Sequence, residues 1–219
     1  MQKKPEETAL EKRENTGSKM FSPSAARNRE AIREAFASLM PSAGKILEVG
    51  AGTGEHAVFL ASALPDVEWL TGDPDEAARA SIAAWIVDAA LPNLSGPHAI
   101  DVCADEWGVE GAAPFDGLVS INMIHIAPFK AAKGLFAGAG RLLHSNGKLF
   151  LYGPFSRNGV HTAPSNAAFD ASLKSRNPGW GVRDLERDLL PLTQENALEL
   201  DAVVEMPANN FTVTFRKVS

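Results

Sequence analysis

Residues 45–54 read KILEVGAGTG, and this stretch decides the fold. Its first half is a short apolar run that predicts a buried strand, and its second half has a glycine at alternate positions. Glycine allows a positive φ and lets a ligand approach the backbone, while a helix expected from His56 offers free N–H groups at its start. A strand, a glycine turn and a helix in this order indicate a site for a nucleotide-like cofactor.

The spacing of the glycines shows which kind of cofactor site the turn could form. Counted from Gly50, a phosphate-binding P-loop requires glycine at position 55 and lysine at position 56, but the sequence has Glu55 and His56. The dinucleotide fingerprint Gly-x-Gly-x-x-Gly also requires a third glycine at position 55, where a carboxylate opposes a pyrophosphate. The spacing therefore excludes a P-loop and makes an NAD site the weaker alternative.

The rest of the chain alternates between strand and helix patterns. Besides 45–49, strands are expected at 67–71, 98–102, 116–122 and 148–152, and helices at 25–40, 56–64, 74–90 and 129–143. Such alternation predicts an α/β fold with a doubly wound, mostly parallel sheet. Two further β-rich runs, 198–206 and 211–216, flank a Pro-Ala-Asn-Asn turn and predict a C-terminal antiparallel hairpin, which makes seven strands.

Length, charge and cysteine content limit the kind of protein. A chain of 219 residues with a net charge of −6 suits one domain and argues against binding to nucleic acid or anionic lipid. It has no apolar run of about 18 residues, so no membrane span is expected. The single cysteine, Cys103, excludes an intramolecular disulfide and favours a cytoplasmic location. The oligomeric state does not follow from the sequence.

Composition also divides the chain. Residues 1–19 mix both charges with few large apolar side chains, so we expect a disordered N-terminal extension. Residues 20–219 are then expected to form a single domain. Within it, residues 154–184 are rich in Pro, Gly, Ser and Asn, with a helix expected at 165–176. A loop-rich insertion after the fifth strand is expected to be a substrate lid.

The residues that follow the expected strands resemble those of the class I S-adenosylmethionine (SAM) methyltransferases. The resemblance covers roughly residues 44–217 and rests on Glu48 before the turn of Gly50, Gly52 and Gly54, then on Asp73, Asp101, Asn122 and Tyr152 at the ends of the next four strands. It implies SAM as the cofactor. It also implies that Asp73 accepts hydrogen bonds from the ribose and that Asp101 with Val102 holds the adenine. Glu48 would orient the turn and the methionine end, near which Asn122 would lie.

A narrower resemblance runs from about residue 20 to residue 217. The chain is similar to small methyltransferase-like proteins with a domain of unknown function, through residues 26–30, 122–125, 152–155, 161–166, 180–184 and 205–210. This resemblance implies no particular substrate.

Three side chains are candidates for catalysis, and two on the first helix are candidates for cofactor binding. His125 and His161 could act as general bases because imidazole titrates near neutrality, and Tyr152 could reach the site with its phenol. Each of the three also has an ordinary packing interpretation. Asn28 and Arg29 could close over the cofactor carboxylate or belong to a solvated helix face.

Two further structural interpretations bear on the site. Asp73 precedes Pro74 and could simply cap a helix. No metal is expected, because the five histidines form no His-x-x-x-His pair and Cys103 has no cysteine partner.

We therefore expect a SAM-dependent methyltransferase that acts on a small-molecule acceptor. The main alternative is a SAM-binding sensor or partner protein without transferase activity. An NAD-dependent oxidoreductase is disfavoured by Glu55.

Overall fold

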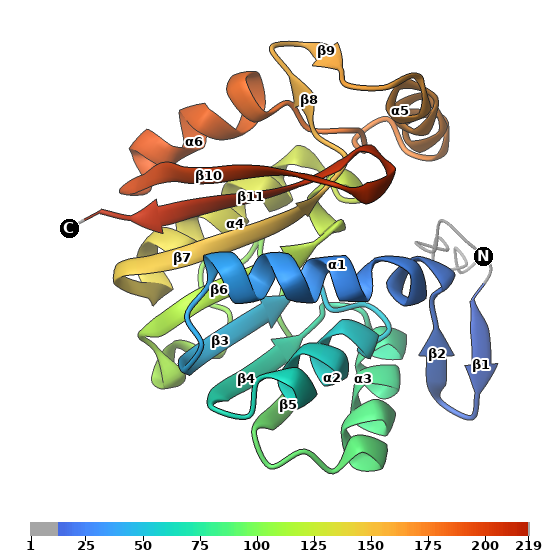
Figure 1. Cartoon of the computed structure of the whole chain (residues 1–219), viewed down its shortest axis with the longest axis vertical. Helices are drawn as coiled ribbons and strands as arrows, with labels where there is room; N and C mark the ends of the chain where they lie inside the picture. The colour runs from blue at the N-terminus through green and yellow to red at the C-terminus, as the bar shows by residue number, and fades with distance from the viewer. Residues whose placement is uncertain (1–12, 219) are drawn as a thin grey trace.

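The computed structural model describes residues 13–218, and a single seven-stranded sheet lies at its centre (Figure 1). The strand order is β10-β11-β7-β6-β3-β4-β5. The five strands from β7 to β5 pair in parallel, whereas β11 is antiparallel to both β7 and β10. The expected doubly wound sheet with an antiparallel C-terminal hairpin is confirmed.

The elements alternate along the chain. The strands of the large sheet are β3 (Gly44–Val49), β4 (Val67–Gly72), β5 (Leu94–His98), β6 (Phe115–Ile121), β7 (Leu143–Gly153), β10 (Leu198–Met206) and β11 (Asn210–Lys217). Two small hairpins are β1 (Glu14–Thr16) with β2 (Lys19–Phe21), and β8 (Ser156–Arg157) with β9 (Val160–His161). The helices are α1 (Pro23–Leu39), α2 (Glu55–Ala63), α3 (Glu76–Ala89), α4 (Phe129–Leu142), α5 (Pro164–Arg176) and α6 (Leu190–Glu195).

Side chains of the parallel strands alternate between two hydrophobic layers. In β7, Phe150 packs in the layer of α1 and α2, whereas Leu149 and Leu151 pack in the layer of α4 and α6. In Figure 1, α1 accordingly crosses in front of the sheet and α4 lies behind it. Burial on both faces explains why these strands are continuous apolar runs rather than alternating ones.

Helix α1 covers the front face for reasons that are visible in its sequence. Ser22 caps the helix by accepting a hydrogen bond from Ala25 N, and Pro23 occupies the first turn. One turn apart, Ile32 and Phe36 are both fully buried. The ring of Phe36 contacts Trp69 of β4, with 5.5 Å between the two ring centroids. The helix expected over 25–40 is confirmed, with its start two residues earlier.

The N-terminal segment departs from the expected disorder. Residues 1–12 lie outside the described part of the chain, but Glu14–Thr16 pairs with Lys19–Phe21 as a hairpin, so the expectation is wrong there. The hairpin is anchored on α3, since Met20 N donates to Ser81 Oγ and Trp85 Nε1 donates to Met20 O. These long-range contacts, rather than an apolar pattern of its own, order the segment.

The third expected strand is misplaced. Residues 98–102 were expected to form it, but β5 ends at His98, which pairs with Gly72. The alternating pattern comes from a loop in which Ile100 and Val102 are buried in the core. Asp101 therefore lies in a turn after the strand instead of at its end.

One other boundary differs from the sequence pattern. Strand β7 begins at Leu143, five residues earlier than expected, through an irregular pairing with Phe115. After the insertion, a π-helical turn, Leu185–Leu189, is followed by α6, with Pro191 in the first turn of α6. The expected helix over 165–176 is confirmed as α5.

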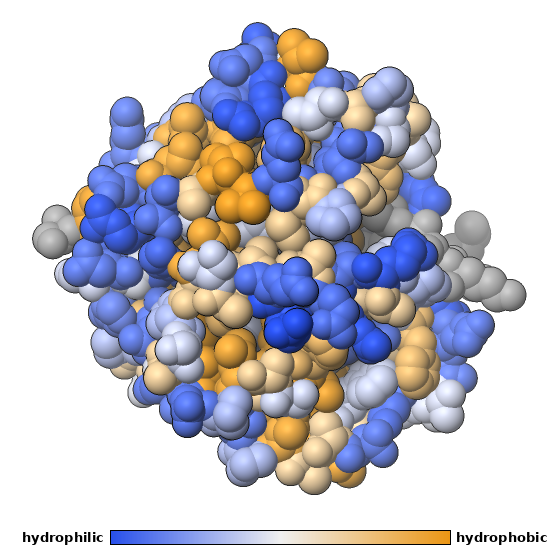
Figure 2. Space-filling view, in the orientation of Figure 1, coloured by the Kyte–Doolittle hydropathy of each residue, from blue (hydrophilic) through white to orange (hydrophobic). Residues whose placement is uncertain are grey.

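The outer edge strand β10 carries exposed Glu199, Asp201 and Glu205. Acidic side chains on an edge strand oppose pairing with a further strand. The face shown in Figure 2 mixes hydrophilic and hydrophobic residues, and exposed apolar side chains of β10 include Leu200 and Val204. Within residues 13–218, no helix has the length and apolar character needed to cross a lipid bilayer.

Replacement of Phe36 with Ala should lower the free energy of unfolding by about 3–5 kcal/mol, because it leaves a cavity between α1 and the sheet. Urea denaturation followed by circular dichroism measures the change. Glu34→Ala, at an exposed position of the same helix, should stay within about 0.5 kcal/mol of the unmodified protein. Equal effects of the two substitutions would contradict the assignment of Phe36 to the core.

Candidate active site

A cavity of about 1050 Å³ lies along the carboxyl ends of the parallel strands. It lies at the point where the adjacent strands β3 and β6 are followed by helices on opposite faces of the sheet, the usual ligand site of open α/β folds. A single ligand typically needs a pocket of roughly 300–1,000 Å³. The cavity is therefore large enough for two small molecules side by side.

The three glycines of the turn after β3 have different tasks. All three adopt a positive φ, of 68° at Gly50, 58° at Gly52 and 91° at Gly54. A Cβ atom at Gly50 would lie 2.5 Å from Met123 Cγ, and one at Gly54 would lie 3.0 Å from Ile82 Cα. At Gly52 the nearest atom is Arg13 Nη2, at 3.8 Å. Two glycines thus permit close packing, and Gly52 leaves backbone open to the cavity.

Glu48 is a buried carboxyl group at the end of β3 and lines the cavity. Trp69 Nε1 and Thr71 Oγ1 donate to its Oε2 atom over 3.1 and 3.3 Å. Burial raises the pKa of Glu48 to about 7, against the opposing effect of these two hydrogen bonds. Among the described residues Oε1 has no hydrogen-bond partner, so one carboxylate oxygen remains for a ligand or for the turn.

Asp73 follows β4 and holds the glycine turn. Its Oδ2 accepts from Gly52 N and its Oδ1 accepts from Asp75 N, both over 2.9 Å. Burial raises the pKa of Asp73. The N-cap of α3 is Asp75, which accepts from Ala78 N, so the interpretation of Asp73 as a helix cap is wrong. Each carboxylate oxygen of Asp73 can accept a further hydrogen bond from a ligand.

Asp101, Val102 and Asn122 complete the predicted lining. Asp101 is exposed and accepts from Cys103 N through Oδ1, and Val102 beside it is buried. Asn122 follows β6 with a φ of 60°, and its N–H donates to Tyr152 O over 2.8 Å. All three line the same cavity as Glu48 and Asp73. The structure thus brings together the predicted residues of four loops.

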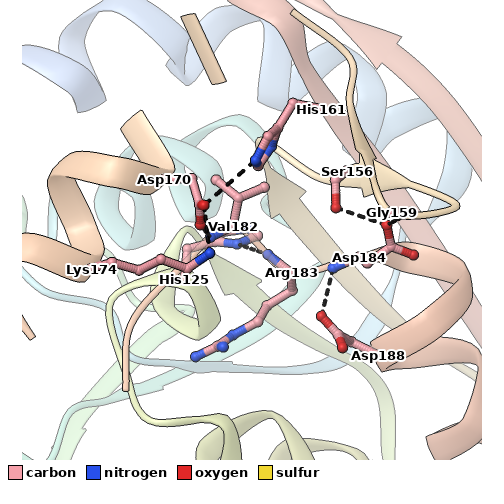
Figure 3. A network of polar contacts seen from close by, with 10 residues as sticks. All are labelled: His125, Ser156, Gly159, His161, Asp170, Lys174, Val182, Arg183, Asp184 and Asp188. Atoms are coloured by element: carbon pink, nitrogen blue, oxygen red, sulfur yellow. Dashed lines mark hydrogen bonds and ion pairs between the residues drawn. The ribbon is translucent and has the colours of Figure 1, made fainter. Parts of the chain in front are cut away.

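His125 also lines the cavity, but its ring is arranged as a hydrogen-bond donor (Figure 3). Its Nδ1 accepts from Arg183 N over 3.1 Å, which places the proton of the neutral ring on Nε2. Burial lowers the pKa of His125 to about 3. Nε2 is buried and has no partner among the described residues. A ring that is neutral and protonated at Nε2 does not fit the expected general base.

Tyr152 lies near two polar side chains of the front helices. Burial raises the pKa of the Tyr152 phenol, against the smaller effect of Asn28 of α1, which lowers it. Asn28 Oδ1 lies 2.9 Å from His56 Nε2 in α2, and burial lowers the pKa of His56 to about 4. All three side chains line the cavity, and His56 engages the amide of Asn28.

Two predicted residues lie outside the cavity lining that the described residues form. His161 faces Asp170, with 3.5 Å between Nε2 and Oδ2, in a cluster with Lys174 that joins α5 to the chain at Val182 (Figure 3). Arg29 is exposed and lies over the ring of Phe59, 4.9 Å from its centroid. His161 and Arg29 are thus not brought together with the other candidate residues.

Several lining residues were not expected from the sequence. Arg13 reaches the glycine turn from the segment expected to be disordered, and His56 follows the turn directly. Phe169 and Asn177 come from the insertion, together with the expected Trp180. The spacing of His56 from the last glycine could have suggested its place, whereas Arg13 depends on docking of the N-terminal hairpin.

Arg183, in the insertion, attaches this segment to the loop after β6. It is buried, and its guanidinium donates to the carbonyl oxygens of Ile124, Ala127 and Gly179. The backbone N–H of Gly181 donates to His125 O over 3.0 Å. The end of the insertion is therefore fixed to the loop after β6, on which His125 lies.

The sequence of this chain matches one known protein family. The sequence model of one family, described as protein of unknown function (DUF938), matches residues 19–217. The chain belongs to this family. The match spans the sheet, the glycine turn and the insertion of the DUF938 protein, and it confirms the narrower resemblance noted in the sequence.

Solved structures share the fold of this DUF938 protein. A putative O-methyltransferase from Nostoc punctiforme is 15% identical with a TM-score of 0.73, and the match covers 89% of this chain and 57% of that one. An O-methyltransferase family 2 protein from Planctomyces limnophilus, solved with apigenin, is 18% identical with a TM-score of 0.70. The match covers 89% of this chain and 60% of that one. CalO1, a methyltransferase in calicheamicin biosynthesis in its SAH-bound form, is 16% identical with a TM-score of 0.66. The match covers 90% of this chain and 61% of that one. The DUF938 chain thus has the methyltransferase fold and spans about three fifths of the length of these proteins.

Residues 13–218 contain no group of three or more His, Cys, Asp or Glu side chains placed to hold a metal ion.

The raised pKa of Glu48 predicts a pH-dependent loss of stability. The folded protein retains this proton between the ordinary pKa near 4.5 and about 7, so the contribution of Glu48 is greatest below pH 4.5 and falls as the pH rises to 7. Glu48→Gln mimics the protonated form and keeps an oxygen for Trp69 and Thr71. Its free energy of unfolding relative to the unmodified protein should rise by about 1–3 kcal/mol between pH 4.5 and pH 8.

Urea denaturation at the two pH values measures this difference. Glu68→Gln, at an exposed position of β4, serves as the control and should show the same offset at both pH values. A Glu48→Gln offset that does not change with pH would contradict the assignment.

Proposed function

We propose that this protein is a SAM-dependent methyltransferase that acts on a small-molecule acceptor. The observation that supports this most directly is the joint placement of Glu48, Gly52 and Asp73 at one end of a cavity in a methyltransferase fold. CalO1, which shares the fold, is a methyltransferase in SAH-bound form, and this likeness supports SAM as the cofactor here.

The donor set of the cavity fits SAM, which has a sulfonium, an ammonium and a ribose diol but no phosphate. Four carboxyl groups line the cavity: Glu48 near the end of β3, Asp73 and Asp75 after β4, and Asp101 after β5. Carboxylates accept hydrogen bonds from hydroxyl and ammonium groups and balance positive charge. The open backbone at Gly52 gives the cofactor room beside Asp73.

The chain's own residues would bind and orient the reactants. Asp73 would accept from the ribose hydroxyls, Asp101 and Val102 would hold the adenine, and Glu48 with Asn122 would position the methionine end. When bound, SAM supplies a methyl group: a nucleophile forms a bond to the methyl carbon as the carbon–sulfur bond breaks and its electron pair returns to sulfur. Alignment of the reacting atoms is then the main task of the protein.

The cavity histidines are weak bases. Burial lowers the pKa of His56 to about 4 and that of His125 to about 3, so neither ring holds an added proton strongly near pH 7. Each also uses a ring nitrogen in a hydrogen bond within the protein. The arrangement therefore suits an acceptor whose nucleophilic atom needs no proton removed.

Residues 154–184 would serve as the substrate lid, since Phe169, Asn177 and Trp180 line the cavity and Arg183 fixes the end of the segment. An NAD site is disfavoured because the Glu55 carboxylate is held at the start of α2, accepting from Ser22 N and Thr53 Oγ1. The single cysteine supports a cytoplasmic location for this activity.

Calorimetry with SAM, S-adenosylhomocysteine and NAD tests the cofactor. SAM and S-adenosylhomocysteine should bind, and Asp73→Asn should weaken both by about 1–3 kcal/mol through loss of charge-assisted hydrogen bonds. The control Asp66→Asn, at an exposed position before β4, should leave both affinities unchanged. Binding of NAD without either SAM ligand would refute the proposal. Binding of SAM without methyl transfer in an acceptor screen would favour the sensor alternative.

A further inference from the structure

The end of the cavity away from the carboxylates has a distinct chemistry. We call it the acceptor end; it is formed by α1, the segment after β6, the end of β7, α5 with the chain that follows it, and the β10–β11 turn. Among the described residues its lining contains no aspartate or glutamate, and its charged side chain is Arg27. Asp170 of α5 acts on His125 from behind this lining and is already paired with Lys174, so a cationic group bound there would find no unpaired carboxylate.

The acceptor end offers aromatic surface. Phe169 of α5 and Trp180 after it line the cavity together with Tyr152. Trp180 and Tyr152 are 7% and 3% exposed, so they are fixed by packing rather than free to move. Aromatic rings pack favourably against other planar rings by offset stacking or edge-to-face contact. The surface is suited to a planar molecule.

The hydroxyl of Tyr152 is available to a ligand. Tyr152 lines the cavity, and the nearby Asn28 directs its Oδ1 atom toward His56 Nε2, 2.9 Å away. An amide oxygen only accepts, so this contact uses the Nε2 proton of the His56 ring. Within residues 13–218, no carbonyl or carboxylate oxygen accepts a hydrogen bond from the Tyr152 hydroxyl. Tyr152 therefore presents a donor on a cavity-lining side chain.

We propose that the methyl acceptor is a small aromatic molecule, uncharged or anionic, with an oxygen that accepts a hydrogen bond from Tyr152. The inference rests on the proposed function and extends it by naming the class of acceptor. It excludes aromatic amines that are protonated at neutral pH.

Ring-matched triplets of ligands test the charge preference. Benzoates, benzamides and benzylamines with the same hydroxyl pattern are screened by ligand-observed NMR against the protein saturated with S-adenosylhomocysteine. Binders should fall among the benzoates and benzamides, with at least tenfold weaker binding of the matching benzylamine. Binders that are mainly amines, evenly spread binders or none at all would overturn the proposal. Failure of S-adenosylhomocysteine itself to bind would instead refute the proposed function.

A negative charge introduced at the acceptor end sharpens this test. Asn177→Asp keeps the oxygen that accepts from Gly179 N and adds a carboxylate to the cavity lining. It should raise the affinity for a benzylamine relative to its benzoate by about tenfold. The matched control Asn146→Asp likewise keeps its contact with Arg216, at a site outside this cavity, and should leave the ratio unchanged. Equal ratios in both variants would count against the proposal.

One variant tests the hydrogen bond of Tyr152. Tyr152→Phe removes the hydroxyl and keeps the ring. It should weaken binding of the best benzamide about tenfold and leave the affinity for S-adenosylhomocysteine and the unfolding temperature unchanged. Loss of S-adenosylhomocysteine affinity would place the hydroxyl on the cofactor, and unchanged benzamide binding would refute the role of Tyr152.

Discussion

The backbone of the glycine turn after β3 is the constraint on which the rest of the site depends. Gly50 packs so closely on Met123 that a side chain would collide with it, and Gly54 does the same with Ile82. The turn is thereby held between the segment after β6 and helix α3. With both neighbours fixed, Gly52 faces the cavity, and its N–H is directed onto the Asp73 carboxylate. These contacts fix the position of the turn at the end of the cavity that the carboxylates line.

The sequence was informative wherever local pattern and tertiary packing agree. Parallel strands buried on both faces are apolar runs, so β3, β4 and β6 were predicted to within one residue at each end. The pattern failed for residues 98–102, because a buried loop alternates apolar and polar residues as a strand does. It also failed for Glu14–Thr16, whose order comes from contacts with α3 that no local pattern encodes.

In the candidate site, too, some features could be predicted from local sequence and others depend on distant contacts. Glu48, Asp73 and Asn122 could be placed together because the carboxyl ends of parallel strands share one edge of the sheet. The orientation of a side chain within that edge depends on partners far away in the chain. Arg183 lies 58 residues from His125, yet its N–H decides which nitrogen of His125 carries the proton. His161 is turned toward Asp170 in a similar way, which spacing along the sequence could not have shown.

The separation of charge along the cavity has a consequence for the reaction. The sulfonium of the proposed cofactor would add a positive charge to the cavity, and two unit charges 4 Å apart repel by about 4 kcal/mol at an effective dielectric constant of 20. A cationic acceptor would meet this repulsion where no lining carboxylate opposes it. An anionic or uncharged nucleophile would not meet it. Under the proposed function, the absence of acidic side chains from the described lining of the acceptor end would thus select among acceptors through the charge of the cofactor.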